Sequence, residues 1–293
     1  MHAAGSRHTV MTLRIGWFST GARKGSQRQR LLTAAMESIR RGELDAEIAF
    51  VFCNRERGEY EEVDSFLELV DSFDLPCLTF SSRQFRRDQG GALSKPDEPL
   101  APWRAEYDRA LAELVGQYPF DIGVLSGYML IFTGEMCNRY PLLNLHPAEP
   151  GGPVGTWKQV IWELIERRAE RSGVLLNLAT EELDRGPVVT YCTYSLRGPA
   201  FDRLWRALGS RSAAEAEQQE SEELPLFQEI RRHGAARELP LVIATLHSLA
   251  DGRVRIDERR VVDEQGRELA GGLELSAEID AAAAPALAGD AER

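Results

Sequence analysis

The sequence lacks any apolar run approaching the roughly 20 residues that a membrane-spanning helix needs. Residues 1–10 also lack the apolar centre of a secretory signal. We therefore expect a cytoplasmic protein that has no membrane partner.

Basic charge is also scarce. The 293 residues contain 35 Lys plus Arg against 46 Asp plus Glu, and the formal net charge is −11 at pH 7. Such a chain repels a nucleic-acid backbone, so we discount DNA and RNA as main partners. The remaining composition, with 43% hydrophobic residues, is ordinary for a globular protein with a sizeable core.

Close pairs of cysteines are absent, because the four cysteines are scattered singly at Cys53, Cys77, Cys137 and Cys192. This spacing excludes a zinc knuckle and a redox motif, and it predicts reduced, mostly buried thiols. The loop at 20–25 also lacks the Gly-x-Gly-x-x-Gly spacing of dinucleotide folds and the Lys-Ser/Thr ending of a nucleotide-binding loop. Both absences argue against a nicotinamide oxidoreductase or a nucleotide enzyme.

Apolar runs and helical periods alternate along the chain. Strands are predicted at 13–19, 46–53, 76–80, 122–126, 142–146, 174–178 and 188–195, with helical periods at 31–39, 63–70, 107–115 and 157–165. Ser26 with Gln29, and Thr156 with Gln159, have capping-box spacing at two helix starts. The fold class is therefore α/β, an open, mostly parallel Rossmann-like sheet with helices on both faces. Ligands of such sheets bind beyond the carboxyl ends of the strands.

The chain divides into four expected parts. Residues 1–11 are predicted to be a disordered extension, 12–200 the catalytic α/β domain, and 201–270 C-terminal helices and a hairpin packed on it. Residues 271–293, which are rich in alanine, are predicted to be a disordered tail. Two polar stretches, 81–101 and 209–223, are expected to be surface excursions.

Asn144 and His146 are two residues apart on a strand that stops at Pro147. Their side chains therefore project from one face at its carboxyl end. An amide donor and an imidazole suit acyl transfer, because they can stabilise an oxyanion and move a proton. The alternative is that Asn144 caps the following loop and His146 is a buried histidine. Asp184 lies in a turn, where it is either an ordinary turn aspartate or the partner of His146.

These residues belong to a wider resemblance. The segments 144–147 (Asn-Leu-His-Pro) and 181–189 (Glu-Glu-Leu-Asp-Arg-Gly-Pro-Val-Val) resemble the signature pair of the folate-dependent formyltransferases, especially the glycinamide ribonucleotide formyltransferases. Segment 124–132 resembles the folate loop of that family, 19–27 its phosphate loop, and 103–108 its Arg-containing helix start. The likeness runs in order from about residue 13 to 189.

The resemblance implies a site and its ligands. Asn144 and His146 would stabilise the tetrahedral adduct formed when an amine attacks 10-formyltetrahydrofolate, and Asp184 would keep His146 protonated. The folate would be a dissociable cosubstrate, with no metal. The implied folate-binding residues are Met129, Leu130, Ile131, Phe132, Ala179, Thr180, Glu181 and Leu183. The implied substrate-binding residues are Gly25, Ser26, Gln27, Arg104, Gly127 and Pro147. Several of these have plain alternatives, since the apolar loop at 129–132 could be core and Arg104 a solvated charge.

The chain departs from the family pattern at three places. The loop after His146, at 148–157, is rebuilt, and the phosphate loop is longer and more basic. The acidic residue that contacts the ribose in the glycinamide ribonucleotide enzymes corresponds here to Ala235, with Glu238 one turn later. The acceptor is therefore the least determined part of the prediction.

The leading prediction is formyl transfer to glycinamide ribonucleotide, in purine biosynthesis, or to another small and phosphorylated amine. A 10-formyltetrahydrofolate hydrolase, in which water replaces the amine, is the closest alternative. A methionyl-tRNA formyltransferase is disfavoured because no basic RNA-binding segment follows residue 189. A folate- or nucleotide-binding protein without catalysis is the alternative from a different class. The oligomeric state stays open, with a homodimer as one option.

Overall fold

The computed structural model of the protein describes residues 12–92 and 100–288, and an eight-stranded sheet forms the centre of this part of the chain. The strand order is β10-β7-β6-β5-β4-β1-β2-β3. The strands are β1 Leu13–Ser19, β2 Ala46–Cys53, β3 Cys77–Thr79, β4 Ile122–Leu125, β5 Leu142–His146, β6 Arg171–Leu178, β7 Val188–Ser195 and β10 Leu273–Glu274. Strands β1 to β5 are parallel, and β6 is antiparallel to both of its neighbours. The predicted open, mostly parallel sheet is confirmed.

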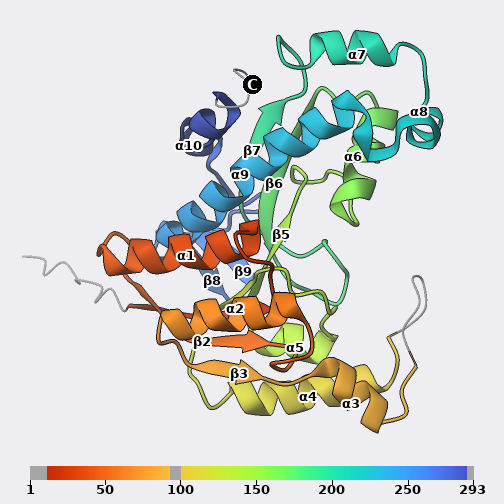
Figure 1. Ribbon diagram of the computed structural model, residues 1–293. Coiled ribbons are helices and arrows are strands. Elements are labelled where there is room, and N and C mark those ends of the chain that lie inside the picture. The colour runs from red at the N-terminus through yellow and green to blue at the C-terminus, as the bar shows by residue number, and fades with distance from the viewer. Residues whose placement is uncertain (1–11, 93–99, 289–293) are drawn as a thin grey trace, which may run out of the picture.

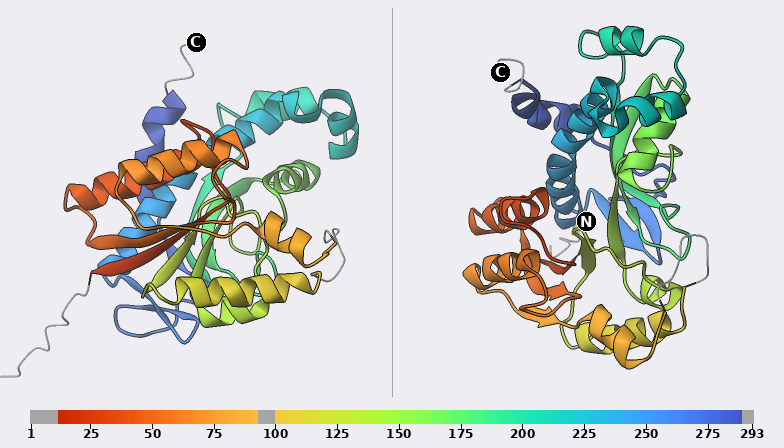
Figure 2. Two further views of the ribbon diagram at one scale, coloured as in Figure 1. Left: turned by 60° about the horizontal axis from the view of Figure 1, so that its bottom comes forward. Right: turned by 45° about the vertical axis from the view of Figure 1, so that its right-hand side comes forward.

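Helices cover both faces of this sheet (Figures 1 and 2). Helices α1 (Gln27–Arg40), α2 (Glu61–Ser72) and α9 (Pro225–Ala250) pack on one face, and α4 (Trp103–Val115) and α5 (Gly134–Arg139) pack on the other. Alternation along β1 explains the two layers, since Ile15 and Trp17 join the core under α1 and α2 while Phe18 joins the core under α4. Because both faces are buried, the strand reads as a continuous apolar run.

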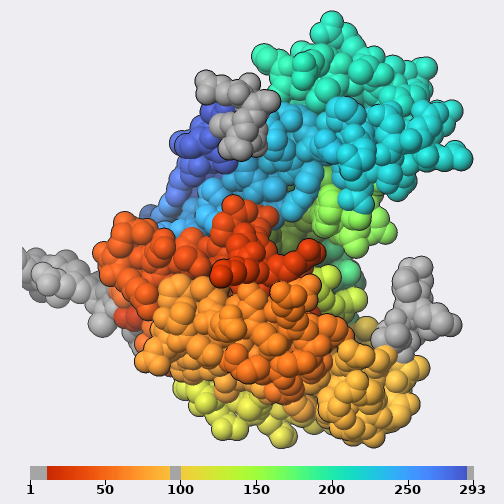
Figure 3. Space-filling model, in the orientation of Figure 1, coloured from red at the N-terminus to blue at the C-terminus, as the bar shows by residue number. Residues whose placement is uncertain are grey.

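A second helical layer extends the C-terminal half. Helices α6 (Trp157–Glu166), α7 (Asp202–Leu208) and α8 (Ala213–Glu220), with a 3₁₀ turn at Ser221–Glu223, share a core with the start of α9. The space-filling view shows these segments above the N-terminal half, with α9 lying directly on α1 (Figure 3). None of the helices in the described ranges has the length and apolarity to cross a membrane.

Two stretches expected to be irregular contain helices. Within 81–101, helix α3 (Ser82–Asp88) is capped by the Ser81 side chain, which accepts from the Gln84 N–H. Within 209–223, α8 begins with a capping box formed by Ser212 and Glu215 and buries Ala213 and Ala216. Such small inner side chains give almost no apolar period, so the pattern of α8 reads as a polar loop.

The prediction of a disordered tail is wrong for residues 273–288. Leu273 and Glu274 pair with β7 as strand β10, and α10 (Ser276–Ala288) buries Ile279 and Ala283. The Asp280 carboxylate accepts from Arg237 of α9 at 2.7 Å. Tertiary contact with α9 and β7 therefore orders an alanine-rich segment that has no strong stripe of its own. Residues 1–11 and 289–293, also predicted to be disordered, lie outside the described residues.

The remaining local predictions concern one hairpin and two helix caps. The expected hairpin forms from β8 (Val254–Asp257) and β9 (Arg260–Asp263). The capping box of Thr156 and Gln159 is confirmed. The box at Ser26 and Gln29 is wrong, because Gln29 Oε1 accepts from the Gly25 N–H and the Ser26 side chain makes no cap bond.

Candidate active site

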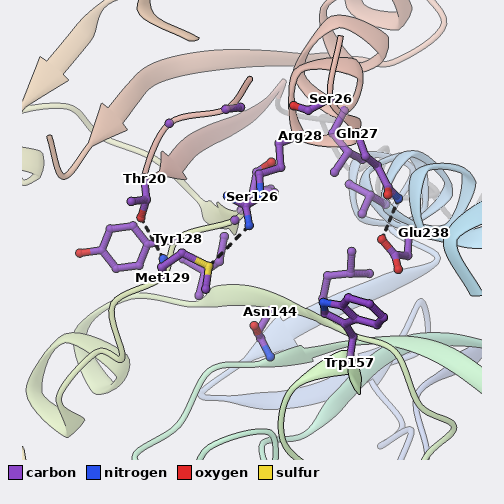
Figure 4. Close-up of a pocket in the computed structure, with 18 of the residues that line it drawn as sticks. Thr20, Ser26, Gln27, Arg28, Ser126, Tyr128, Met129, Asn144, Trp157 and Glu238 are labelled. Carbon is purple, nitrogen blue, oxygen red and sulfur yellow. Dashed lines mark hydrogen bonds between the residues drawn. The ribbon is translucent and has the colours of Figure 1, made fainter. Parts of the chain in front are cut away.

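A large cavity of about 790 Å³ opens at the carboxyl ends of β1, β4 and β5, where the topology predicted a site. Residues following these three strands line it, together with the first turn of α1, the loop at 155–157 and three side chains of α9. The lining includes all three predicted catalytic residues, Asn144, His146 and Asp184. Figure 4 shows Asn144 and Trp157 facing the α1 side of the cavity.

The Asn144 amide is held by two acceptors. Its Nδ2 group donates to Asp184 Oδ1 at 2.9 Å and to Asn177 Oδ1 at 3.3 Å. Asn177 is directly opposite Asn144 in the antiparallel pairing of β5 with β6, and it is fully buried. Because an amide nitrogen carries two hydrogens, both are engaged in this state.

His146 is 3% exposed and lines the cavity two residues beyond Asn144 on the same strand. Its Nε2 is 2.7 Å from the Pro153 carbonyl oxygen, which can only accept, so Nε2 carries a proton. Its Nδ1 faces Asp184 Oδ2 at 3.6 Å. Both ring nitrogens thus face oxygen atoms of the site, one from the Pro153 backbone and one from the Asp184 side chain.

Asp184 joins the cluster from the turn after β6. Its backbone has a φ of +57°, a left-handed conformation in which Asp is among the better tolerated residues. Its Oδ2 also accepts from the Gly155 N–H at 3.3 Å. The turn is fixed at Gly186, where an added Cβ would lie 1.7 Å from the Leu178 carbonyl oxygen. The structure therefore brings Asp184 to both Asn144 and His146, which the sequence could only suggest.

The two segments expected to bind the folate lie beside each other. A Cβ added to Gly134, just after the loop at 129–132, would be 3.0 Å from Glu181 Oε2. Three of the five exposed large apolar side chains among the described residues belong to these segments, with Met129 67%, Ile131 43% and Leu183 53% exposed. Thr180 and Ala179 stiffen the second segment, since Thr180 Oγ1 donates to the Glu182 carbonyl and the Ala179 N–H donates to the Leu142 carbonyl. An exposed apolar surface of this kind fits a flat aromatic ligand such as a pterin.

Not every residue of the expected folate loop faces this surface. Phe132 is buried and stacks on Tyr128 with ring centroids 4.5 Å apart, and Leu130 packs against the same core. Of the four residues at 129–132, Met129 is the one that lines the cavity. The alternative of a plain core loop is thus correct for Leu130 and Phe132.

Arg104 lies away from the cavity. It is buried, donates to the Ile131 carbonyl oxygen, and lies 3.9 Å from the Asp108 carboxylate. Burial lowers the pKa of Arg104 and raises the pKa of Asp108. Asp108 Oδ2 accepts from the Thr133 N–H at 2.6 Å, so this pair holds the carboxyl-terminal end of the loop. The alternative of a solvated charge is therefore wrong for Arg104, which does not line the cavity. Its expected contact with the substrate stays a prediction.

Most, but not all, of the expected substrate-binding residues line the cavity. Ser26, Gln27, Gly127 and Pro147 line the cavity, and Gly25 does not. The Gln27 side chain donates to Glu238 Oε2 at 2.7 Å and to the Ala235 carbonyl at 3.3 Å, which ties α1 to α9. Glu238 is also paired with Arg231. The acidic residue one turn beyond Ala235 therefore reaches the cavity.

Several cavity residues were missed by sequence reasoning. They are Arg28, Trp157 and Arg231 in the lining, and Asn177 behind it, whereas Thr20 and Ser126 of the lining fall within the expected phosphate and folate segments. For Asn177 a signal was present, since a lone Asn interrupts the apolar run of β6. Buried polar groups in such runs are normally hydrogen-bonded, which points to a polar partner on a neighbouring strand.

The four thiols are free. Burial raises the pKa of Cys53 and Cys192 to about 12, and that of Cys77 and Cys137 to about 11. They are therefore protonated at neutral pH and are poor nucleophiles. The prediction of reduced, mostly buried thiols is confirmed. No group of three or more potential metal-ligating side chains occurs within 12–92 and 100–288.

Comparison with curated proteins finds two kinds of relative. The formyltetrahydrofolate deformylase of Haemophilus influenzae is 27% identical over 150 residues, which are 50% of this chain and 44% of that protein. The phosphoribosylglycinamide formyltransferase of Escherichia coli (strain K12) is 35% identical over 92 residues, which are 29% of this chain and 41% of that protein. In both cases the match spans less than half the length of the relative.

Solved structures share the fold over most of the chain. Glycinamide ribonucleotide transformylase 1 from Symbiobacterium toebii has a TM-score of 0.58 and 21% identity, covering 86% of this chain and 93% of that one. A formyltetrahydrofolate deformylase from Pseudomonas syringae has a TM-score of 0.55 and 20% identity, covering 86% and 66%. The profile of the family described as formyl transferase matches residues 24–194 of the 293, which is more than half of the sequence. The chain therefore belongs to the formyl transferase family.

Proposed function

We propose that this chain transfers the formyl group of 10-formyltetrahydrofolate to the amine of a small phosphorylated substrate, with glycinamide ribonucleotide as the leading acceptor. The main support for this proposal is the cluster of Asn144, His146 and Asp184 in the wall of one large cavity at the carboxyl ends of the strands. Donors already held in place stabilise a developing oxyanion more than mobile water does.

The reaction begins when the acceptor nitrogen attacks the formyl carbon and the carbonyl oxygen becomes an oxyanion. Asp184 is placed to take the proton that the amine loses. A protonated Asp184 accepts less strongly from Asn144 Nδ2, which frees an amide hydrogen for the oxyanion. The bond from the formyl carbon to the folate nitrogen then breaks, and that nitrogen takes up the proton.

His146 contributes charge in this mechanism. With Nε2 bound to the Pro153 carbonyl and Nδ1 facing Asp184, its ring has no free N–H to offer a ligand in this state. The family resemblance implies a protonated His146, and a cation there would stabilise the oxyanion through space, because water is largely excluded around a residue that is 3% exposed. The His146 role is thus electrostatic, and Asn144 is the direct donor.

The acceptor assignment is supported by the α1 side of the cavity. Ser26 and Gln27 stand at the amino end of a 14-residue helix, where free N–H groups favour a phosphate. Glu238 lies beside Gln27, 2.7 Å from its amide nitrogen, and its carboxylate can accept from a sugar hydroxyl. This contact takes the place of the missing acidic residue at Ala235. A role in purine biosynthesis and a cytoplasmic location stay predictions.

A second candidate is hydrolysis of 10-formyltetrahydrofolate. It is favoured by the curated relatives, of which the deformylases match 50% of this chain and the bacterial phosphoribosylglycinamide formyltransferase 29%. Water could attack the same carbon with the same three residues in the same roles.

The deciding experiment follows consumption of 10-formyltetrahydrofolate by the purified protein, with and without glycinamide ribonucleotide. Consumption that requires the amine supports the transferase, and equal rates in both reactions support the hydrolase. Folate binding without consumption, across a panel of small amines, would overturn catalysis and favour a binding protein. Loss of consumption in His146→Ala and Asp184→Ala would tie the activity to this cavity.

A further inference from the structure

Arg28 projects into the cavity from the first turn of α1. Its guanidinium lies across Gly127, where an added Cβ would come within 2.2 Å of Nε and 2.6 Å of Cζ. Gly127 also has a φ of +67°, a left-handed conformation that favours glycine, and the absence of a Cβ leaves room for the flexible Arg28 side chain. The backbone at the end of β4 is thus shaped to receive this arginine, and Figure 4 shows Arg28 beside Ser126 and Met129.

The Arg28 charge has no counter-charge among the described residues. Its hydrogen-bonding partner there is the Met129 thioether, at 3.6 Å, and a thioether is a weak acceptor. The carboxylates that line the cavity are engaged elsewhere. Glu238 pairs with Arg231 and Gln27, Asp184 accepts from Asn144 and Gly155, and Glu62 lies 3.9 Å from Arg23.

Burial of this cation is unfavourable without an anion. It lowers the pKa of Arg28, with desolvation as the cause, yet a guanidinium remains charged near neutral pH. A half-buried and unpaired charge in a cavity wall is the state expected of a residue whose partner arrives with a ligand.

A second unpartnered group adjoins the first. Ser126 is 4% exposed and lines the cavity, and its Oγ has no hydrogen-bond partner among the described residues. It directly precedes Gly127, the residue that Arg28 covers. A guanidinium fork and a buried hydroxyl at one place can together bind the oxygens of a carboxylate or a phosphoryl group.

We propose that Arg28 and Ser126 bind an anionic oxygen group of the acceptor amine and thereby restrict the enzyme to anionic acceptors. This inference rests on the proposed transfer reaction for its role. It concerns residues outside the segment 19–27 that resembles a phosphate loop. Neutral amines of the same size leave the Arg28 charge uncompensated and are poor acceptors.

The first test measures anion binding without folate, by titrating inorganic phosphate and acetate into the protein. Arg28→Met keeps the length of the side chain and removes its charge and donors. We expect binding to weaken about 10- to 100-fold, the range for losing hydrogen bonds to a charged group. Arg30→Met is the matched control, because Arg30 is exposed on the same helix and the change in net charge is identical.

Each outcome of this titration bears on the proposal. Loss of phosphate binding assigns a phosphoryl group to the pocket, and loss of acetate binding assigns a carboxylate. Equal binding by wild type and Arg28→Met would overturn the proposal, as would a wild type that binds neither anion. An equal loss in Arg30→Met would overturn it too, since the effect would then be one of net charge. Ser126→Ala, which removes one hydroxyl, is expected to weaken binding by about 3- to 10-fold.

The second test separates this inference from the proposed function. The glycinamide ribonucleoside and its ribonucleotide differ only in the phosphate, and wild type should favour the anionic ribonucleotide by at least about tenfold in kcat/KM. In Arg28→Met this preference should collapse. If no amine is formylated at all, the proposed transfer fails, while the folate-free anion titration still decides whether Arg28 and Ser126 form an anion site.

Discussion

Replacing Asp184 by asparagine tests the centre of the site with almost no change in shape. The two carboxylate oxygens accept from two donors, Asn144 Nδ2 at 2.9 Å and the Gly155 N–H at 3.3 Å, and Oδ2 lies 3.6 Å from His146 Nδ1. An asparagine amide offers one oxygen and one NH₂ group. In either orientation the NH₂ must point at a group that is itself a donor, so one side of the network is always broken.

The size of the effect follows from these contacts. A hydrogen bond to a charged group contributes about 1.5–3 kcal/mol, and removal of one preorganised oxyanion donor lowers kcat by about 10²–10³-fold in measured enzymes. Asp184→Asn removes the proton acceptor and misorients Asn144 together. We therefore expect kcat to fall at least 10²-fold, roughly 2.7 kcal/mol in the barrier. The folded structure should persist, because the turn is held independently by Gly186.

The assay is a single-turnover measurement of 10-formyltetrahydrofolate consumption at saturating folate. Glu182→Gln is the matched control, since Glu182 is exposed in the same turn and its replacement removes the same charge. A rate for Asp184→Asn within about threefold of wild type, with folate binding intact, would refute the assigned proton transfer. An equal loss in Glu182→Gln would show that the charge of the turn, and not its contacts, matters.

Three further predictions concern the surroundings of the site. Asn177→Ala removes the second acceptor of the Asn144 amide, so steady-state kinetics should show kcat falling about 3- to 10-fold with KM little changed. Thr245→Val leaves the buried Thr190 hydroxyl without its partner at 2.6 Å and should lower the free energy of unfolding by about 1–3 kcal/mol, measured by urea denaturation. The double variant Thr190→Val with Thr245→Val leaves no unpaired hydroxyl and should regain most of that free energy. Burial lowers the pKa of His233 from its ordinary value near 6.5, so the folded state binds fewer protons than the unfolded chain just below that pH. The free energy of unfolding should therefore fall as the pH drops below this value, by at most about 1.4 kcal/mol per pH unit. Urea unfolding at about pH 7.5 and about pH 5.5 should show a smaller fall for His233→Gln than for wild type.

The parts of the fold that the sequence predicted are those with a strong local pattern. Strand β1 is a continuous apolar run, and Asn144 and His146 stand two apart before Pro147, so both the strand and the shared face could be read directly. Helices α8 and α10 could not, because alanines form the buried face of α8 and α10 buries one large apolar residue, Ile279, beside Ala283. Their position depends on neighbours far away in the sequence.

In the site, too, features with a local pattern could be predicted and contacts between distant segments could not. The contact of Asn177 with Asn144 depends on the register between two antiparallel strands, which no local pattern fixes. The burial of Arg104 was missed because its partner, the Ile131 carbonyl, comes from a loop 27 residues later. Arg28 was missed because an arginine in the first turn of a helix is usually solvated, and its burial follows only from the approach of Gly127.

Helix α9 contributes to the cavity wall from outside the segment that matches the family. The family match ends at residue 194, and α9 begins at Pro225, yet its Arg231, Glu238 and Val242 form part of the cavity wall. Asn144, His146 and Asp184 lie wholly inside the matched segment. Part of the cavity wall therefore comes from a helix outside the matched segment, so two chains can share that segment and still differ in this wall.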